Sequence, residues 1–95
     1  GRAPGAVTID AGAVKALRGG GSLLPVGVSA VAGDFERGDT VRVLGPVGEE
    51  LARGICNYGA SDLARIRGRR SDDIEAVLGY HFGDEVIHRD DLALL

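Results

Sequence analysis

Short apolar runs alternate with polar and glycine-rich breaks along the first third of the chain. Residues 6–9 alternate weakly between apolar and polar side chains, and this pattern predicts a first short β-strand. Asp10 follows in the position of a helix N-cap, and Val14 and Leu17 give the short helix behind it one apolar stripe. The glycines at 19–21 end that helix, because glycine adopts left-handed backbone angles without steric cost.

The next stretch predicts further strands joined by tight turns. Residues 23–31 are mostly apolar but contain a proline, which favours a buried or edge strand. Two turn signals in 33–39 precede an alternating run at 40–44. Residues 45–48 then predict a hairpin connection into another strand at 49–57.

The last two of these strands differ in how clearly their faces can be assigned. Val41 and Val43 are expected to point into the core and Arg42 into solvent. The following strand alternates Leu51, Arg53 and Ile55 with Ala52, Gly54 and Cys56. Because Arg53 does not fit an apolar face, the sequence leaves the two faces of this strand unassigned.

The second half of the chain predicts two short helices and two brief strands. Each helix is expected to begin at a serine cap, Ser61 or Ser71, and Gly79 is expected to end the second helix. Residues 85–88 and 92–95 are predicted to be strands on either side of a polar turn. Few helices fall between successive strands, which argues against a parallel βαβ sheet. We therefore predict a mainly β fold with short helices, closed into a barrel of five to six strands.

Composition is consistent with one small domain. The chain has 95 residues, of which 44% are hydrophobic, only 4% are aromatic and 16 are glycine. At this size a chain has material for a single core, which aliphatic side chains must fill. There is no methionine, so we expect residues 1–5 to be a linker remnant and residues 6–95 to be the domain. One cysteine and no long apolar run favour the cytoplasm and no membrane partner.

The distribution of charge along the chain indicates where its surface could contact a partner. The net charge of −3 argues against a free-standing nucleic-acid binder, but local patches matter more than totals. Two basic clusters are the candidate RNA or partner contacts: Lys15, Arg18, Arg65, Arg67, Arg69 and Arg70. Three alternatives stay open for them, namely contact with RNA, docking onto another domain, and a solvated surface without a partner.

No set of side chains in the sequence is typical of catalysis or metal binding. The spacing of His81, His88, Cys56 and Asp84 matches no zinc pattern, so we predict no metal site. Cys56 has no neighbouring base to form a thiolate, and the adjacent aspartate pairs diverge. The glycines at 19–21 follow a helix, whereas phosphate loops precede one. We therefore predict no catalytic residue and no cofactor in this domain.

Several sequence blocks resemble a known family. The blocks VTIDAGAVKALRGGGSLLPVGV and GDFERGDTVRV are similar to PUA domains. The later blocks LARGICNYGASDLARIRG, RSDDIEAVLGY and HRDDL resemble, more narrowly, the C-terminal PUA domain of glutamate 5-kinase. Gly21 and Asp91 depart from that pattern, where lysine or alanine and asparagine are usual. The resemblance implies a PUA-like pseudo-barrel, excised from the C-terminal end of a larger enzyme.

The resemblance also implies what the parent protein does. Glutamate 5-kinase phosphorylates the side-chain carboxylate of glutamate with ATP and magnesium, as the first step of proline biosynthesis. Its ATP and magnesium sites belong to an amino acid kinase domain that precedes the PUA domain. The resemblance thus implies a non-catalytic domain with a regulatory or assembly role, whose partners are that kinase domain and, through the parent enzyme, a homo-oligomer. The alternative is an RNA-binding PUA module with a basic surface.

Overall fold

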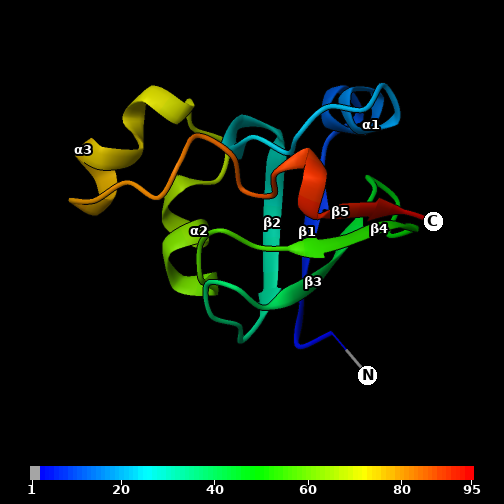
Figure 1. Ribbon diagram of the computed structural model, residues 1–95, viewed down its shortest axis with the longest axis horizontal. Coiled ribbons are helices and arrows are strands. Elements are labelled where there is room, and N and C mark those ends of the chain that lie inside the picture. Colours follow the sequence, from blue (N-terminus) through cyan, green and yellow to red (C-terminus); the bar gives the residue numbers. More distant parts are fainter. Residues whose placement is uncertain (1–2) are drawn as a thin grey trace.

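The chain folds around one mixed β-sheet, with short helices packed on two sides of it (Figure 1). The computed structural model describes residues 3–95, so part of the predicted linker at 1–5 lies outside the described residues. Within residues 3–95 there are five strands and three α-helices: β1 Gly5–Ile9, α1 Ala11–Arg18, β2 Val28–Gly33, β3 Thr40–Leu44, β4 Glu50–Ile55, α2 Ala60–Ile66, α3 Ile74–Leu78 and β5 Leu92–Leu94. Single turns of 3₁₀ helix occupy Pro25–Gly27, Ser71–Asp73 and Arg89–Asp91.

The sheet has the strand order β2-β1-β3-β4-β5. β1 runs parallel to β3, and the other neighbouring strands are antiparallel. The segments before the two edge strands meet through a bridge between Leu23 and Ile87, where the Leu23 N–H donates to the Ile87 carbonyl at 2.9 Å. This bridge joins the two ends of the sheet, so the predicted mainly β pseudo-barrel is confirmed.

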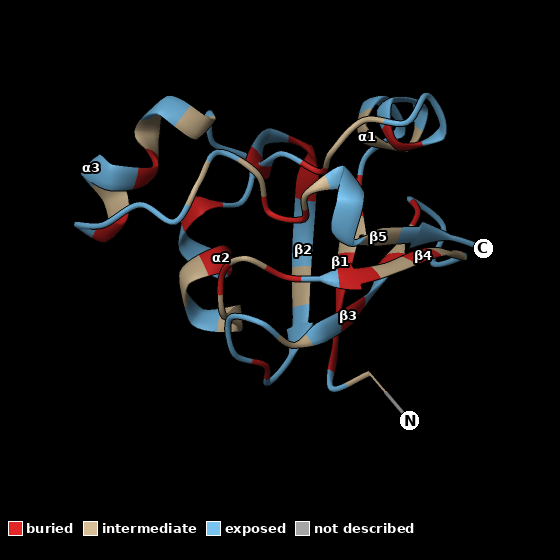
Figure 2. Cartoon of the chain, in the orientation of Figure 1, coloured by how far each residue is buried: buried red, intermediate tan, exposed pale blue. Residues whose placement is uncertain are grey.

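The strand faces follow the alternation in the sequence, and the structure assigns the face that the sequence left open. Val41 and Val43 of β3 are fully buried and Arg42 is exposed, as predicted. In β4 the small residues face the core, since Ala52 and Gly54 are buried, as is Cys56 directly after the strand. Arg53 therefore lies on the outer face. Figure 2 shows the buried residues concentrated on β1, β3 and β4 and on the inner side of α2.

The predicted end of the first helix and its cap are confirmed, whereas both serine caps are wrong. The Asp10 carboxylate accepts a hydrogen bond from the Ala13 N–H at 2.8 Å at the start of α1. α2 begins at Ala60 with Gly59 as its N-cap, so Ser61 lies inside the helix. Ser71 opens a 3₁₀ turn, and its hydroxyl donates to the Asp84 carbonyl at 2.8 Å. The hydroxyl serves a long-range contact there in place of a local cap.

One predicted strand begins later than expected, and another is not a strand. In the stretch 23–31, a 3₁₀ turn at Pro25–Gly27 intervenes, and β2 begins only at Val28. Proline at the first position of that turn fixes φ at a helical value and supplies no N–H, which favours the turn over an extended strand. In the stretch 85–88, pairing is limited to the isolated bridge at Ile87.

Tyr58 fastens the 80–84 loop to the core. Its side chain is fully buried, and its hydroxyl donates to the Gly83 carbonyl at 2.6 Å and accepts from the Phe82 N–H at 2.9 Å. The Tyr58 and Phe82 rings pack with centroids 5.6 Å apart. Burial raises the pKa of the Tyr58 phenol, which keeps the hydroxyl protonated and able to donate.

No helix within residues 3–95 is long and apolar enough to span a bilayer.

Candidate functional site

A groove of about 300 Å³ runs between α1 and the segment that follows it. One wall comes from α1 and the other from the 3₁₀ turn, and the lining consists of Asp10, Gly12, Ala13, Ala16, Ser22, Leu24, Val26 and Gly27. Leu24 is 42% exposed and Val26 is 53% exposed, so two apolar side chains reach solvent at this groove. We call this surface the α1 groove.

Small residues set the width of the α1 groove. The Asp10 N–H donates to the Gly27 carbonyl at 3.0 Å, which holds the 3₁₀ turn against the start of α1. A Cβ atom at Gly27 would lie only 2.6 Å from the Cβ of Ala13, well inside contact distance. The close approach of turn and helix therefore requires glycine at this position.

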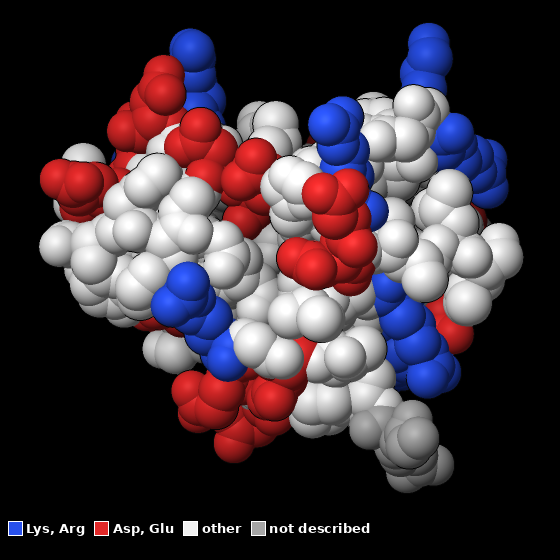
Figure 3. Space-filling model, viewed as in Figure 1, with Lys and Arg blue, Asp and Glu red and all other residues white. Residues whose placement is uncertain are grey.

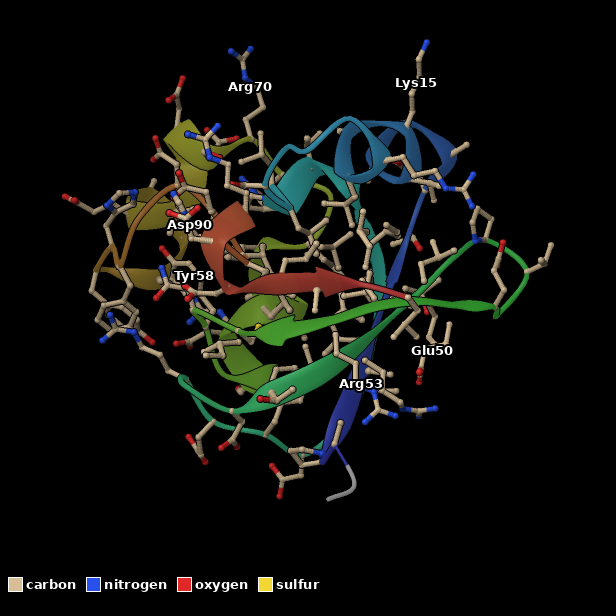
Figure 4. All side chains as sticks on the ribbon, turned by 45° about the vertical axis from the view of Figure 1, so that its right-hand side comes forward. Lys15, Glu50, Arg53, Tyr58, Arg70 and Asp90 are labelled. Carbon is tan, nitrogen blue, oxygen red and sulfur yellow. The ribbon has the colours of Figure 1, made fainter. Side chains whose placement is uncertain are left out.

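Cationic side chains stand on two sides of the α1 groove. Lys15 is exposed on α1. The Gly68 N–H donates to the Pro25 carbonyl at 2.8 Å, which brings the arginine-rich segment after α2 against the 3₁₀ turn. Figure 4 shows Lys15 and Arg70 projecting from the same end of the molecule, on either side of that turn. Residues far apart in the sequence thus share one face.

A further arginine reaches this face without having been predicted. The Arg89 backbone N–H donates a hydrogen bond to the Ser22 hydroxyl oxygen at 2.8 Å. The exposed Arg89 therefore lies next to the groove lining. The surface is not uniformly basic, because Asp10 lines the groove and Asp90 follows Arg89. In Figure 3, Lys and Arg side chains project along the upper edge with Asp and Glu side chains between and below them.

The six predicted contact residues do not lie on one surface of the structure. Arg18 lies away from the α1 groove, beside Glu50 and Leu94 at the other side of α1. Arg65 donates to the Val77 carbonyl at 2.5 Å. Arg67 donates to the Ser29 carbonyl at 3.0 Å. These two guanidinium groups fasten α2 to α3 and to β2. Of the predicted six, Lys15 and Arg70 flank the groove, and Arg69 is exposed in the segment beside Arg70.

The groups that the sequence raised for chemistry do not line the α1 groove. Cys56 is fully buried, and burial raises the pKa of its thiol, which disfavours the reactive thiolate. His81 pairs with Asp84 at 3.0 Å and His88 with Asp90 at 3.5 Å. Among residues 3–95, no three His, Cys, Asp or Glu side chains are grouped so that they could hold a metal ion.

Sequence reasoning missed Leu24, Val26 and Arg89 as members of the candidate surface. The pair Leu24 and Val26 carried one signal, since two apolar residues flank a proline where a turn rather than a strand exposes them. Arg89 carried none, because its placement depends on a contact with Ser22 across most of the chain.

The mixed five-stranded sheet, joined at its two ends by the Leu23–Ile87 bridge, defines the chain as a small pseudo-barrel domain. The family model of the PUA domain matches residues 5–78, and the chain therefore belongs to the PUA domain family. The chain is 55% identical over 94 residues to glutamate 5-kinase of Deinococcus radiodurans, a match that covers 98% of the chain and 26% of that enzyme. It is 54% identical over 90 residues to glutamate 5-kinase of Brucella ovis, covering 95% of the chain and 24% of that enzyme. The chain thus spans about a quarter of these relatives, and it corresponds to their C-terminal PUA region.

Solved structures share the fold. A PUA domain of Aeropyrum pernix K1, crystallised as a tartrate complex, aligns with a TM-score of 0.66 and 28% identity over 90% of this chain and 41% of that chain. A chain of the archaeal box H/ACA sRNP Nop10–Cbf5 complex aligns with a TM-score of 0.62 and 19% identity over 90% of this chain and 25% of its own. The predicted fold and family are confirmed.

Proposed function

We propose that this chain is the non-catalytic C-terminal PUA domain of a cytoplasmic glutamate 5-kinase, in which it has a regulatory or assembly role. The observation that carries the proposal is the 55% identity over 98% of the chain. The parent enzyme would transfer the γ-phosphoryl group of ATP to the side-chain carboxylate of glutamate, the first step of proline biosynthesis. ATP and magnesium would bind to the kinase domain of the same polypeptide.

The chemistry of the described side chains supports a non-catalytic role. The α1 groove is lined by small and apolar residues, and its one carboxylate, Asp10, is engaged as the cap of α1. The thiol of Cys56 is buried and kept protonated, so it cannot attack a substrate in solution. This domain would therefore act through its surface, with the exposed Leu24 and Val26 available for contact with the kinase domain or a neighbouring subunit.

An activity assay tests the proposal. Glutamate-dependent release of ADP from ATP is measured for the full-length protein that contains this chain and for residues 1–95 alone. We expect turnover by the full-length protein and none by the isolated domain above a heat-inactivated control. Turnover by the isolated domain would overturn the non-catalytic role, and a full-length protein without glutamate-dependent turnover would overturn the proposed parent enzyme.

RNA binding is the second candidate function, and the placement of Lys15, Arg70 and Arg89 around the α1 groove favours it. Binding to a structured RNA would then weaken with salt by a log–log slope of about −0.9 for each phosphate contact on a duplex. We expect Lys15→Gln with Arg70→Gln to reduce the steepness of that slope by about 1.8, because two contacts are removed. Arg18→Gln is the control for loss of a positive charge elsewhere, since Arg18 is exposed but lies away from the groove. No binding at low salt, or equal effects of all variants, would dismiss this candidate.

A further inference from the structure

Two arginines lie directly opposite each other on the outer face of the sheet. Arg42 of β3 and Arg53 of β4 are register partners in the antiparallel pair. Directly opposite residues project to the same face with Cβ atoms about 5 Å apart, and like charges in that position repel. Arg42 is exposed and the Arg53 side chain is 42% exposed. The stability of the fold therefore does not explain why two arginines occupy these positions.

One carboxylate partly offsets the two guanidinium groups. Glu50 approaches Arg53, with its Oε2 3.5 Å from Nε. The pairing register of β3 with β4 shifts so that Leu51 is the extra residue, and this bulge brings Glu50 to the face of Arg53. Among residues 3–95, Arg42 forms no ion pair. The pair thus keeps one positive charge that no side chain of the described part of the domain neutralises.

The surroundings leave the two guanidinium groups open to a partner. The next residue across the sheet from Arg42 is Ala6 of β1, and the next from Arg53 is Ala93 of β5. A hollow of about 480 Å³ lies over the pair and is lined by Arg42, Arg53, Glu50, Ala3 and Pro4. In Figure 4, Glu50 and Arg53 project on the same side of β4, toward the edge of the molecule where β1 begins.

We propose that Arg42 and Arg53 dock a carboxylate side chain of the kinase domain that precedes this chain in the parent enzyme. This inference rests on the proposed function, because the curated relatives carry most of their length before the region matched here. Ala3 and Pro4 form one wall of the hollow, so the N-terminal end of the described residues lies beside the two arginines. Two adjacent guanidinium groups present parallel N–H donors to a carboxylate, and one added carboxylate balances the remaining positive charge.

A protein carboxylate fits this site better than a nucleic-acid backbone. A phosphodiester chain gains affinity from a row of several cations. Here the row across the sheet ends after two arginines, with alanine on either side. Glu50 beside Arg53 would also repel a second phosphate. The observations therefore favour a single acidic side chain as the occupant.

Limited proteolysis of the full-length protein tests the docking. Cleavage between the two domains is measured at about 50 mM salt, where exposed ion pairs are weakly screened. We expect the Arg42→Gln, Arg53→Gln variant to be cut about fivefold faster than the wild type, the effect of losing a modest pair of ionic contacts. At about 500 mM salt the wild type should approach the rate of the variant. Equal cleavage rates of wild type and variant at low salt would overturn the proposal.

Two further variants separate charge from folding. Arg18→Gln with Arg69→Gln removes the same charge from exposed positions elsewhere, and we expect it to be cut at the wild-type rate. Arg42→Lys with Arg53→Lys keeps the charge and should be protected better than the glutamine variant. If the lysine and glutamine variants are cut equally fast, or the control is cut as fast as either, carboxylate docking at this pair is wrong.

Glutamate-dependent ADP release by the same samples distinguishes the two levels of the proposal. If the wild type is active and the Arg42→Gln, Arg53→Gln variant is cut at the wild-type rate, only the docking site is wrong. A wild-type protein without activity would overturn the proposed parent enzyme and, with it, the named partner. Weaker RNA binding by the Arg42→Gln, Arg53→Gln variant, with cleavage unchanged, would assign the pair to phosphate and contradict carboxylate docking.

Discussion

Tyr58→Phe removes one oxygen atom and two hydrogen bonds from the attachment of the 80–84 loop. The ring remains, so its packing against Phe82 is preserved. The Gly83 carbonyl loses its donor and the Phe82 N–H loses its acceptor. The change therefore isolates the contribution of the hydroxyl from that of the ring.

The magnitude follows from the burial of those groups. A hydrogen bond contributes about 1 kcal/mol, and more when the group left behind is shielded from water, so two bonds at a part-buried site amount to about 2 kcal/mol. In a domain of this size about 1 kcal/mol corresponds to roughly 4–8 °C in Tm. We expect Tyr58→Phe to lower Tm by about 8–16 °C.

Thermal and urea denaturation of residues 1–95, followed by circular dichroism, measures the effect. Tyr80→Phe is the matched control, because the Tyr80 hydroxyl donates to the Asp62 carboxylate at 2.5 Å but the residue is 40% exposed. Solvent can replace that bond, and we expect a much smaller fall in Tm than for Tyr58→Phe. If the two variants melt at the same temperature, the hydroxyl of Tyr58 does not fasten the loop as described.

Three further predictions concern other parts of the molecule. Cys56 should react with a maleimide only after unfolding, because its thiol is buried. Burial raises the pKa of the folded thiol above the ordinary 9.0, so the thiol of the unfolded chain ionises at lower pH. The free energy of unfolding should therefore fall as the pH rises past 9.0, and it should fall less in Cys56→Ala. Gly27→Ala should destabilise the domain by about 1–3 kcal/mol in urea titrations, because the added Cβ clashes with Ala13. Adding Ala13→Gly should restore the stability, and failure to restore it would contradict the close approach of turn and helix. Arg42→Gln should raise the stability of the isolated domain by about 0.2–1 kcal/mol at low salt, by relieving repulsion from Arg53, and a loss of stability would contradict that repulsion.

The sheet was predictable where local pattern and burial agree. In the strand at 40–44, valines alternate with polar residues, and the period of two assigned both the strand and its inner face. β4 was harder, because Ala52 and Gly54 are too small to mark an inner face while Arg53 and Ile55 lie outside. There the sheet selects small residues for close packing, as a Cβ at Gly54 would lie 2.6 Å from Ile87.

The candidate site was less predictable, because long-range hydrogen bonds assemble it. Ser71 has the sequence signature of a helix cap, yet its hydroxyl bonds to Asp84. The arginine-rich segment reaches the α1 groove through one bond between Gly68 and Pro25, which no local pattern reveals. Sequence spacing likewise did not show that Arg42 and Arg53 are opposite each other, since register depends on the bulge in β4.

The central proposal is that this PUA domain is part of a glutamate 5-kinase and takes no part in the phosphoryl transfer. The most direct measurement compares glutamate-dependent ADP release by the full-length protein and by a version that ends before Gly1. The account predicts that the shortened protein still phosphorylates glutamate, with changes confined to its regulation or assembly. Complete loss of turnover by a shortened protein that remains folded would contradict it.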